Sequence, residues 1–270
     1  MLKQRIITAV VLVLLTFSAL FYTTDNVWKG VLLGVALLAA WEWASFARIE
    51  IPVLKMIYAF GVVVTANFAI NMLSVENILL FAVLELLIVL RLVHLYQFTK
   101  ATKSIGSTSF VALSGALLII LFVVVLFKFR VEFGALTLLL SMLTVWAIDT
   151  GAYFVGRKYG KTKLAEYVSP GKTWEGVWGG VLLSFVTAVI VLSSLNVTGL
   201  ASIFGFAAVL TIIALVSIYG DLYESVLKRQ NGLKDSGKIL PGHGGVLDRV
   251  DSLLVALPLL YLAWYYFLQG

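Results

Sequence analysis

The densest group of polar residues in this 270-residue chain lies between positions 221 and 251. Asp221, Ser225 and Lys228 are spaced i, i+4 and i+7, so they share one face of a helix. Asp248 and Asp251 are spaced i, i+3 at the expected start of the last helix and share a face there. Carboxylate oxygens are ligands that Mg²⁺ prefers, and ammonium groups neutralise phosphate oxygens. These residues predict metal-assisted chemistry on a nucleoside triphosphate.

The segment that joins these two helices is rich in residues that break regular structure. It contains NG, PG and GG pairs and Pro241, which predict irregular backbone that is buried or lines a wet cavity. His243 within it is either a phosphate donor or a partner for loop hydrogen bonds. For Asp248 and Asp251, the alternative to chemistry is a favourable interaction with the helix dipole.

A second polar loop, residues 157–175, follows a helix with a polar face. Asp149, Tyr153 and Gly156 are spaced i, i+4 and i+7 on this face, which leads toward Arg157. An aspartate within an apolar span needs a partner or water. Asp149 is therefore either a functional carboxylate or half of a structural ion pair.

The same loop contains the tripeptide GKT, which does not form a Walker A motif. The glycine that the motif requires earlier is replaced by Glu166, and no strand is expected before it. We expect residues 169–171 to form a turn. Lys172 and Thr173 can then offer an ammonium and a hydroxyl to a phosphate near a helix start. The alternative is a solvated basic loop that sets topology.

The composition shows what must hold these loops. The chain is 61% hydrophobic and 13% charged, which is typical of a membrane protein. It has no cysteine, so it has neither a disulfide nor a thiolate metal site. Apolar stretches long enough to cross a bilayer are expected at 6–22, 27–47, 53–73, 76–97, 109–127, 132–156, 176–195, 201–224 and 250–268. The predicted fold class is all-α: a polytopic integral membrane protein of about nine helices, with a polar cavity in its C-terminal half.

Basic residues predict how these helices are oriented. With the N-terminus inside, 16 of the 20 Lys and Arg residues fall on inner segments, as the positive-inside rule requires. This places the N-terminus and both polar loops in the cytoplasm and predicts a bacterial-type inner membrane protein. We expect two regions: N-terminal helices over 1–140, and a catalytic region over 141–270 with cytoplasmic loops 157–175 and 225–250.

Three motifs in the C-terminal half resemble one known family. Residues 225–251 read S-x-L-K-R, four residues, K-D-x-G, two residues, L-P-x-H-G-G-V-x-D-R-V-D. Residues 149–160 read D-T-x-A-Y-x-x-G-R-x-x-G, and residues 169–176 read S-P-x-K-T-x-E-G. The chain resembles the phosphatidate cytidylyltransferases, also called CDP-diacylglycerol synthases. Gly171 departs from the Lys or Asn more usual there, which puts only the local backbone in doubt.

The resemblance implies a reaction, its participants and its residues. Phosphatidic acid, presented from the bilayer, attacks the α-phosphorus of CTP to give CDP-diacylglycerol and pyrophosphate, with Mg²⁺ alone or with a second cation. It implies no nucleic-acid partner, and a homodimer is compatible with it. The implied metal ligands are Asp221 and Asp248, and Asp149 and Asp251 are further candidates that either bind the metal or support its ligands. The implied catalytic residues are Asp221, Asp248, Asp251, Lys228 and Arg249. The implied substrate-binding residues are Arg157, Ser169, Lys172, Thr173, Glu175, Arg229, Lys234, Asp235 and His243.

Other functions are compatible with parts of this pattern. A CTP-dependent lipid kinase could share the nucleotide site and transfer the γ-phosphate. An ion-coupled transporter also has broken helices and carboxylates within the membrane. The aspartate pattern of the CDP-alcohol phosphotransferases is absent. Glu42 and Glu85, each within an expected span, are either packing partners or cavity residues.

Overall fold

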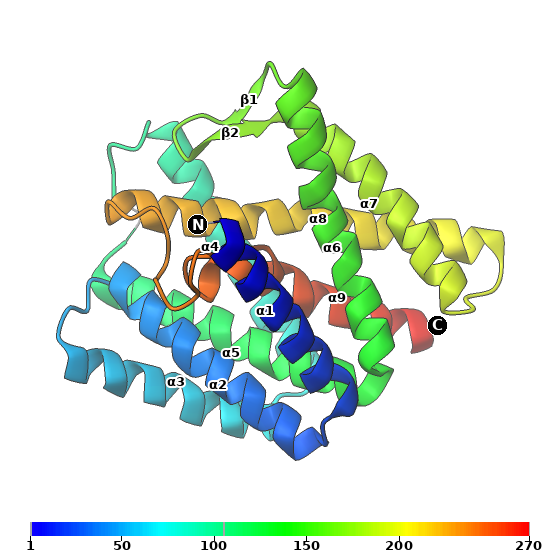
Figure 1. The fold of residues 1–270 in the computed structure, drawn as a ribbon, viewed down its shortest axis with the longest axis horizontal. Helices are drawn as coiled ribbons and strands as arrows, with labels where there is room; N and C mark the ends of the chain where they lie inside the picture. Colours follow the sequence, from blue (N-terminus) through cyan, green and yellow to red (C-terminus); the bar gives the residue numbers. More distant parts are fainter. Residues whose placement is uncertain (1, 105, 270) are drawn as a thin grey trace.

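A computed structural model describes residues 2–104 and 106–269, with backbone only for residues 2–5 and 269. These residues form nine α-helices, a short antiparallel hairpin and one 3-10 turn (Figure 1). The helices are α1 (Leu2–Tyr22), α2 (Asp25–Phe46), α3 (Pro52–Met72), α4 (Val75–Phe98), α5 (Thr108–Phe133), α6 (Ala135–Tyr159), α7 (Trp174–Ser194), α8 (Leu200–Gln230) and α9 (Asp251–Gln269). The strands are β1 (Lys163–Ala165) and β2 (Ser169–Thr173), and the turn is η1 (Leu247–Arg249).

The helices have the lengths and composition of membrane spans. In the described part of the chain, the eight helices α2–α9 are long and apolar enough to cross a membrane. The described apolar part of α1, Ile6–Tyr22, is shorter. The predicted all-α membrane fold is therefore confirmed. Eight of the nine predicted spans coincide with the helices α2–α9, whereas a span formed by α1 stays a prediction. Helix α8 has 31 residues, more than the roughly 20 that a crossing needs, so its polar last turns continue beyond an ordinary span.

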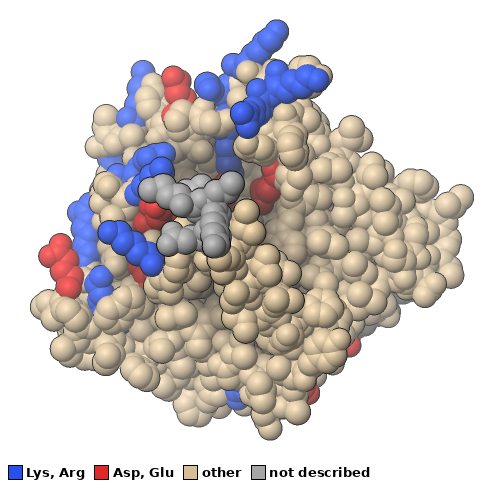
Figure 2. Space-filling view, in the orientation of Figure 1, with Lys and Arg blue, Asp and Glu red and all other residues tan. Residues whose placement is uncertain are grey.

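The loops that were expected inside lie at one end of the helix bundle. Arg48, after α2, donates from Nε to Asn231 Oδ1, after α8, over 3.4 Å. Tyr167, in the hairpin, donates its backbone N–H to Gln97 Oε1 near the end of α4, over 3.1 Å. Figure 2 shows Lys and Arg side chains gathered over the hairpin and the neighbouring side of this face, while most of the rest is neither basic nor acidic. We call this the loop end.

A single arginine connects the elements at the opposite end. Arg130, near the end of α5, donates to Leu20 O at 2.8 Å and to Asp25 Oδ1 at 3.0 Å. Its guanidinium also lies over the Trp28 ring. Arg130 thus joins the link between α1 and α2 to α5, which explains one of the few basic residues that the positive-inside count placed outside.

Helices α6 and α7 approach each other closely because their contact is built from glycines. A Cβ atom at Gly151 would overlap the backbone of Gly179 and Gly180, and one at Gly176 would overlap the carbonyl of Ala152. Small residues permit such close backbone contact between membrane helices. This crossing forms one wall of the cavity described below.

The turn predicted at residues 169–171 is wrong. The structure places the turn at residues 166–168, and Ser169–Thr173 form strand β2. This strand pairs with β1, with Ala165 opposite Ser169 and Lys163 opposite Thr173. The fixed φ of Pro170 suits extended backbone as well as a turn, and a two-stranded ribbon leaves edges where its missing N–H is tolerated. The hairpin is the one sheet in the described residues of an otherwise helical fold.

Candidate functional site

A cavity of about 520 Å³ that is lined by both apolar and charged side chains opens where α6, β2, α7 and α8 meet at the loop end. Asp149 and Arg157 come from α6, Lys172 and Thr173 from β2, and Asp221 from α8. These five side chains come from two separate sequence motifs and from the helix before the third. The cavity therefore brings together residues from polar segments that are separate in the sequence.

One wall of the cavity is the face of α6 that the sequence predicted. Asp149, Tyr153 and Gly156 all line it. Arg157 Nη1 donates to the Tyr153 hydroxyl at 2.8 Å, and its guanidinium lies over the Tyr153 ring. Tyr153 therefore holds the Arg157 side chain at the cavity, while Asp149 remains exposed there.

The opposite wall holds an ion pair. Lys172 Nζ lies 2.5 Å from Asp221 Oδ2, and about a quarter to a third of each side chain is exposed. Ser225, one turn along α8, donates to Asp221 Oδ1 at 3.3 Å. Asp221 and Ser225 therefore share one face of α8, as predicted. The Asp221 carboxylate points from this face toward Lys172 in the polar loop 157–175.

Three residues of this loop have structural contacts. Thr173 caps α7, since its Oγ1 accepts from Gly176 N at 3.2 Å. Glu175 accepts from the backbone N–H groups of Lys161 at 3.0 Å and Thr162 at 3.1 Å. Ser169 is in β2. Of these, only Thr173 lines the cavity, so Glu175 and Ser169 contribute by shaping the loop that carries Lys172.

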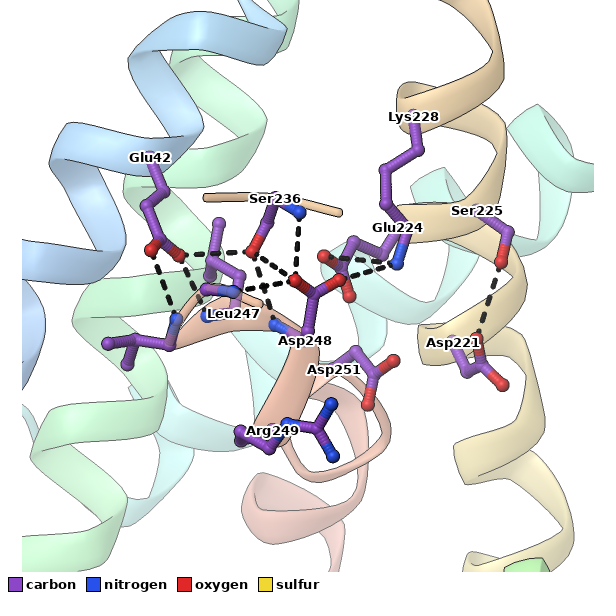
Figure 3. A network of polar contacts seen from close by, with 12 residues as sticks. Glu42, Asp221, Glu224, Ser225, Lys228, Ser236, Leu247, Asp248, Arg249 and Asp251 are labelled. Atoms are coloured by element: carbon purple, nitrogen blue, oxygen red, sulfur yellow. Dashed lines mark hydrogen bonds and ion pairs between the residues drawn. The ribbon is translucent and has the colours of Figure 1, made fainter. Parts of the chain in front are cut away.

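A second polar cluster surrounds Asp248, which is close to fully buried (Figure 3). Its Oδ1 accepts from Lys228 Nζ at 2.8 Å. Its Oδ2 accepts from the N–H groups of Ser236 and Gly245, both at 2.8 Å, and lies 2.9 Å from Ser236 Oγ. Burial alone would raise the pKa of Asp248, but the hydrogen bonds from Lys228, Gly245 and Ser236 hold it below its usual value. Both oxygens of this carboxylate are engaged.

The prediction that Asp248 and Asp251 share one helix face is wrong. Asp248 lies in η1, and α9 begins only at Asp251, after Val250 leaves helical geometry. This turn is wound more tightly than an α-helix, because Arg249 N donates to Val246 O at 3.1 Å and Val250 N donates to Leu247 O at 3.0 Å. In Figure 3, Asp251 points away from the loop toward Asp221. Gly220 permits this, because a Cβ atom there would overlap the Asp251 carbonyl oxygen.

The remaining predicted residues lie in the last turn of α8 and in the loop between α8 and α9. Arg249 donates from Nε at 3.1 Å and from Nη2 at 2.7 Å to the carbonyl oxygen of His243. Nδ1 of His243 is buried and has no hydrogen-bond partner in the described part of the chain. The side chains of Arg229, Lys234 and Asp235 are exposed. The structure does not bring these five residues to the cavity of Asp149 and Asp221.

Sequence reasoning left Glu42 unassigned, although it contacts the second cluster. Its carboxylate, on α2, accepts hydrogen bonds from Ser236, Val246 and Leu247. The signal that could have identified it is its place within an apolar span, because a carboxylate there must have partners.

The donor types in the cavity fit a magnesium ion. In the described ranges, no group of three or more His, Cys, Asp and Glu residues is arranged to hold a metal. Mg²⁺ needs fewer protein ligands, since it commonly binds through one or two carboxylates together with substrate phosphates and water. Asp149 and Asp221, both lining the cavity, supply two carboxylates of this kind. Asp248 could join them only by giving up hydrogen bonds that it makes here.

Comparison with known proteins gives a consistent result. The model of the cytidylyltransferase family matches residues 3–267. A protein from Haemophilus influenzae named phosphatidate cytidylyltransferase is 38% identical over 290 aligned residues, which cover 99% of each chain. A protein of the same name from Pseudomonas aeruginosa is 38% identical over 267 residues, covering 96% of this chain and 95% of the relative. Another, from Thermotoga maritima, is 43% identical over 139 residues, about half of each chain.

Proposed function

Because this chain belongs to the cytidylyltransferase family, we propose that it is a phosphatidate cytidylyltransferase. It transfers the cytidylyl group of CTP to phosphatidic acid and releases pyrophosphate. The observation that carries this proposal is the cavity, which places the basic groups of Lys172 and Arg157 beside the carboxylates of Asp149 and Asp221. That combination suits phosphate groups that approach together with a divalent cation.

The reaction is a displacement at phosphorus. An oxygen of the lipid phosphate forms a bond to the α-phosphorus of CTP, and the bond from that phosphorus to the oxygen bridging to the β-phosphate breaks. The bonding electrons leave with pyrophosphate. Both reactants are anionic, so the protein must neutralise and position them before they can react.

The cavity residues divide this task by charge. Lys172 and Arg157 neutralise phosphate oxygens, and the Lys172 ammonium exchanges Asp221 for such an oxygen when substrate binds. Asp149 and Asp221 would hold Mg²⁺, which when bound stabilises the negative charge on the phosphates. The ion pair of Lys172 with Asp221 keeps both side chains oriented toward the cavity before substrate arrives.

The location of the cavity suits a lipid and a soluble substrate. The cavity lies at the loop end of the bundle, and on the face that Figure 2 shows, most of the remaining surface is uncharged. We propose that the loop end faces the cytoplasm across a bacterial inner membrane, because the basic residues gather there and CTP is supplied there. A homodimer stays a prediction, which the molecular mass of the detergent-solubilised protein checks.

One assay tests this function against its alternatives. Purified protein is incubated with phosphatidic acid and CTP labelled either at the α- or the γ-phosphate, with and without Mg²⁺. We expect α-label in a CDP-lipid, γ-label in pyrophosphate, and no product without the cation. Transfer of γ-label to the lipid would instead identify a lipid kinase. Substrate flux into vesicles without nucleotide consumption would identify a transporter.

A further inference from the structure

Glu42 connects the N-terminal helices to the loop that carries Asp248. It lies on α2, more than half the length of the chain before the motif at 225–251, and it is 2% exposed. An ionised carboxylate buried this deeply is stable only with strong hydrogen-bond partners. Its partners therefore show what it does.

Among the described residues, the side-chain hydrogen bonds of Glu42 all go to the loop between α8 and α9. Oε1 accepts from Val246 N at 3.0 Å, and Oε2 accepts from Leu247 N at 3.0 Å. Ser236 Oγ lies 3.1 Å from Oε2. One carboxylate thus joins two loop segments, around Ser236 and around Leu247, that are separated by the whole glycine-rich stretch (Figure 3).

The loop backbone is shaped to enclose this carboxylate. Cβ atoms at Gly237 and at Gly245 would both overlap the carboxylate of Glu42. Neither glycine has positive φ, so conformational freedom does not explain them, whereas the space that Glu42 occupies does. Glycine at both positions lets two segments of loop backbone pack directly against the Glu42 side chain of α2.

The contacts continue from Glu42 to α8 through three residues. Ser236 Oγ lies between the carboxylates of Glu42 and Asp248, at 3.1 Å and 2.9 Å. Asp248 in turn accepts from Lys228 Nζ at 2.8 Å. Removing Glu42 would leave the N–H groups of Val246 and the buried Leu247 without their partner and would release the loop from α2.

We propose that Glu42 is a positioning residue for cytidylyl transfer: through Ser236 it fixes the loop conformation that holds Asp248 and Lys228 together. This rests on the proposed function. It makes the N-terminal helices part of the catalytic apparatus, because they supply the anchor of a loop whose motif lies elsewhere in the chain. Glu42 itself does not line the cavity of Asp149 and Asp221.

The test compares variants that differ in the number of hydrogen-bond acceptors at position 42. Glu42→Gln keeps the shape of the side chain but has one acceptor oxygen, and its NH₂ group would face a backbone N–H. Glu42→Ala has none. Glu50→Gln is the matched control, because Glu50 is an exposed carboxylate just after α2. Turnover and KM for CTP are measured on the monodisperse, full-length protein.

A spectroscopic reporter reads the loop without reference to activity. The chain has no cysteine, so Lys238→Cys at an exposed loop position accepts a single nitroxide spin label. We expect kcat to fall about tenfold or more in Glu42→Gln and further in Glu42→Ala. We expect KM for CTP to change less, and the spin-label spectrum to sharpen as the loop gains mobility. Glu50→Gln should match the parent protein in all three measurements.

Two further results separate positioning from general stability. Ser236→Ala keeps the hydrogen bonds of Glu42 to Val246 and Leu247 but removes the hydroxyl between Glu42 and Asp248. It should therefore lower kcat, and it tests the proposal independently if the Glu42 variants fail to fold. Unchanged kcat in Ser236→Ala, or a rigid spin-label spectrum in a folded Glu42 variant, overturns the proposal. If the parent protein makes no CDP-lipid, the proposed function fails, while the spin-label spectra still decide whether Glu42 fixes the loop.

Discussion

Lys172 on β2 and Asp221 on α8 form an ion pair across the cavity, with 2.5 Å between Nζ and Oδ2. The pair joins two polar regions that are distant in the sequence and connects the hairpin to α8. Because Asp221 contacts the Lys172 ammonium, a phosphate that binds Lys172 competes with Asp221 for the same positive charge, which couples the two residues. This coupling makes the roles of the two residues separable by mutation.

Lys172→Ala should weaken the use of CTP. Losing a hydrogen bond to a charged group costs about 1.5–3 kcal/mol, which corresponds to roughly a 10- to 150-fold loss in kcat/KM for CTP. Lys161→Ala, at an exposed side chain of the same loop, should leave kcat/KM unchanged and serves as the control. If the two variants behave alike, Lys172 does not contact the nucleotide.

Asp221→Asn should lower turnover on the order of 100-fold or more, because it removes a negative charge from the expected magnesium site. Its activity and that of Asp149→Asn should need more Mg²⁺ for half-maximal rate than the parent enzyme. EDTA should abolish the parent activity, and added Mg²⁺ should restore it. Glu166→Gln, at an exposed carboxylate in the hairpin turn, is the control. An unaltered Mg²⁺ dependence in both aspartate variants would place the cation elsewhere.

Asp221 and Lys172 should also show coupling in a double-mutant cycle. Neighbouring residues that interact give a combined effect different from the sum of the single effects. Once Asp221 has become Asn, the Lys172→Ala change removes no ion pair, so we expect its added loss in kcat/KM to be smaller than in the parent. Strict additivity would mean that the ion pair is irrelevant to catalysis.

Asp248→Asn should differ from Asp221→Asn in its effect on stability. Asp248 is almost completely buried and accepts from Lys228, Ser236 and Gly245. An asparagine NH₂ group there would face another donor, at a cost of about 1–3 kcal/mol. We therefore expect a lower unfolding temperature together with reduced turnover in Asp248→Asn, whereas Asp221→Asn should unfold like the parent. Equal unfolding temperatures for these two variants would contradict the assignment of Asp248 to the loop network.

How far the site could be predicted depends on which kind of partner each residue has. Helical spacing predicted the face that carries Asp149 and Tyr153, because the period of a helix is fixed. The partners of Glu42 are backbone N–H groups at Val246 and Leu247, and backbone groups leave no mark in a sequence pattern.

The break in helical geometry between Asp248 and Asp251 could not be predicted from the sequence for a related reason. Aspartate near a helix start is compatible with both a continuous helix and a capped turn. Only the loop contacts of Gly245 and Leu247 decide between them. The pairing of Lys172 with Asp221 likewise depends on how α6 and α7 bring the hairpin against α8, which spacing within one helix cannot show.

Thiol labelling in intact cells should place the loop end in the cytoplasm. Single cysteines at Glu166 and Lys238, both exposed at the loop end, should not react with an impermeant reagent added outside. A cysteine at Thr198, exposed between α7 and α8 at the opposite end, should react. All three should react after permeabilisation, which checks that each thiol is accessible. Because CTP is soluble and the cavity opens at the loop end, the reverse labelling pattern would separate the enzyme from its nucleotide and would contradict both the topology and the proposed reaction.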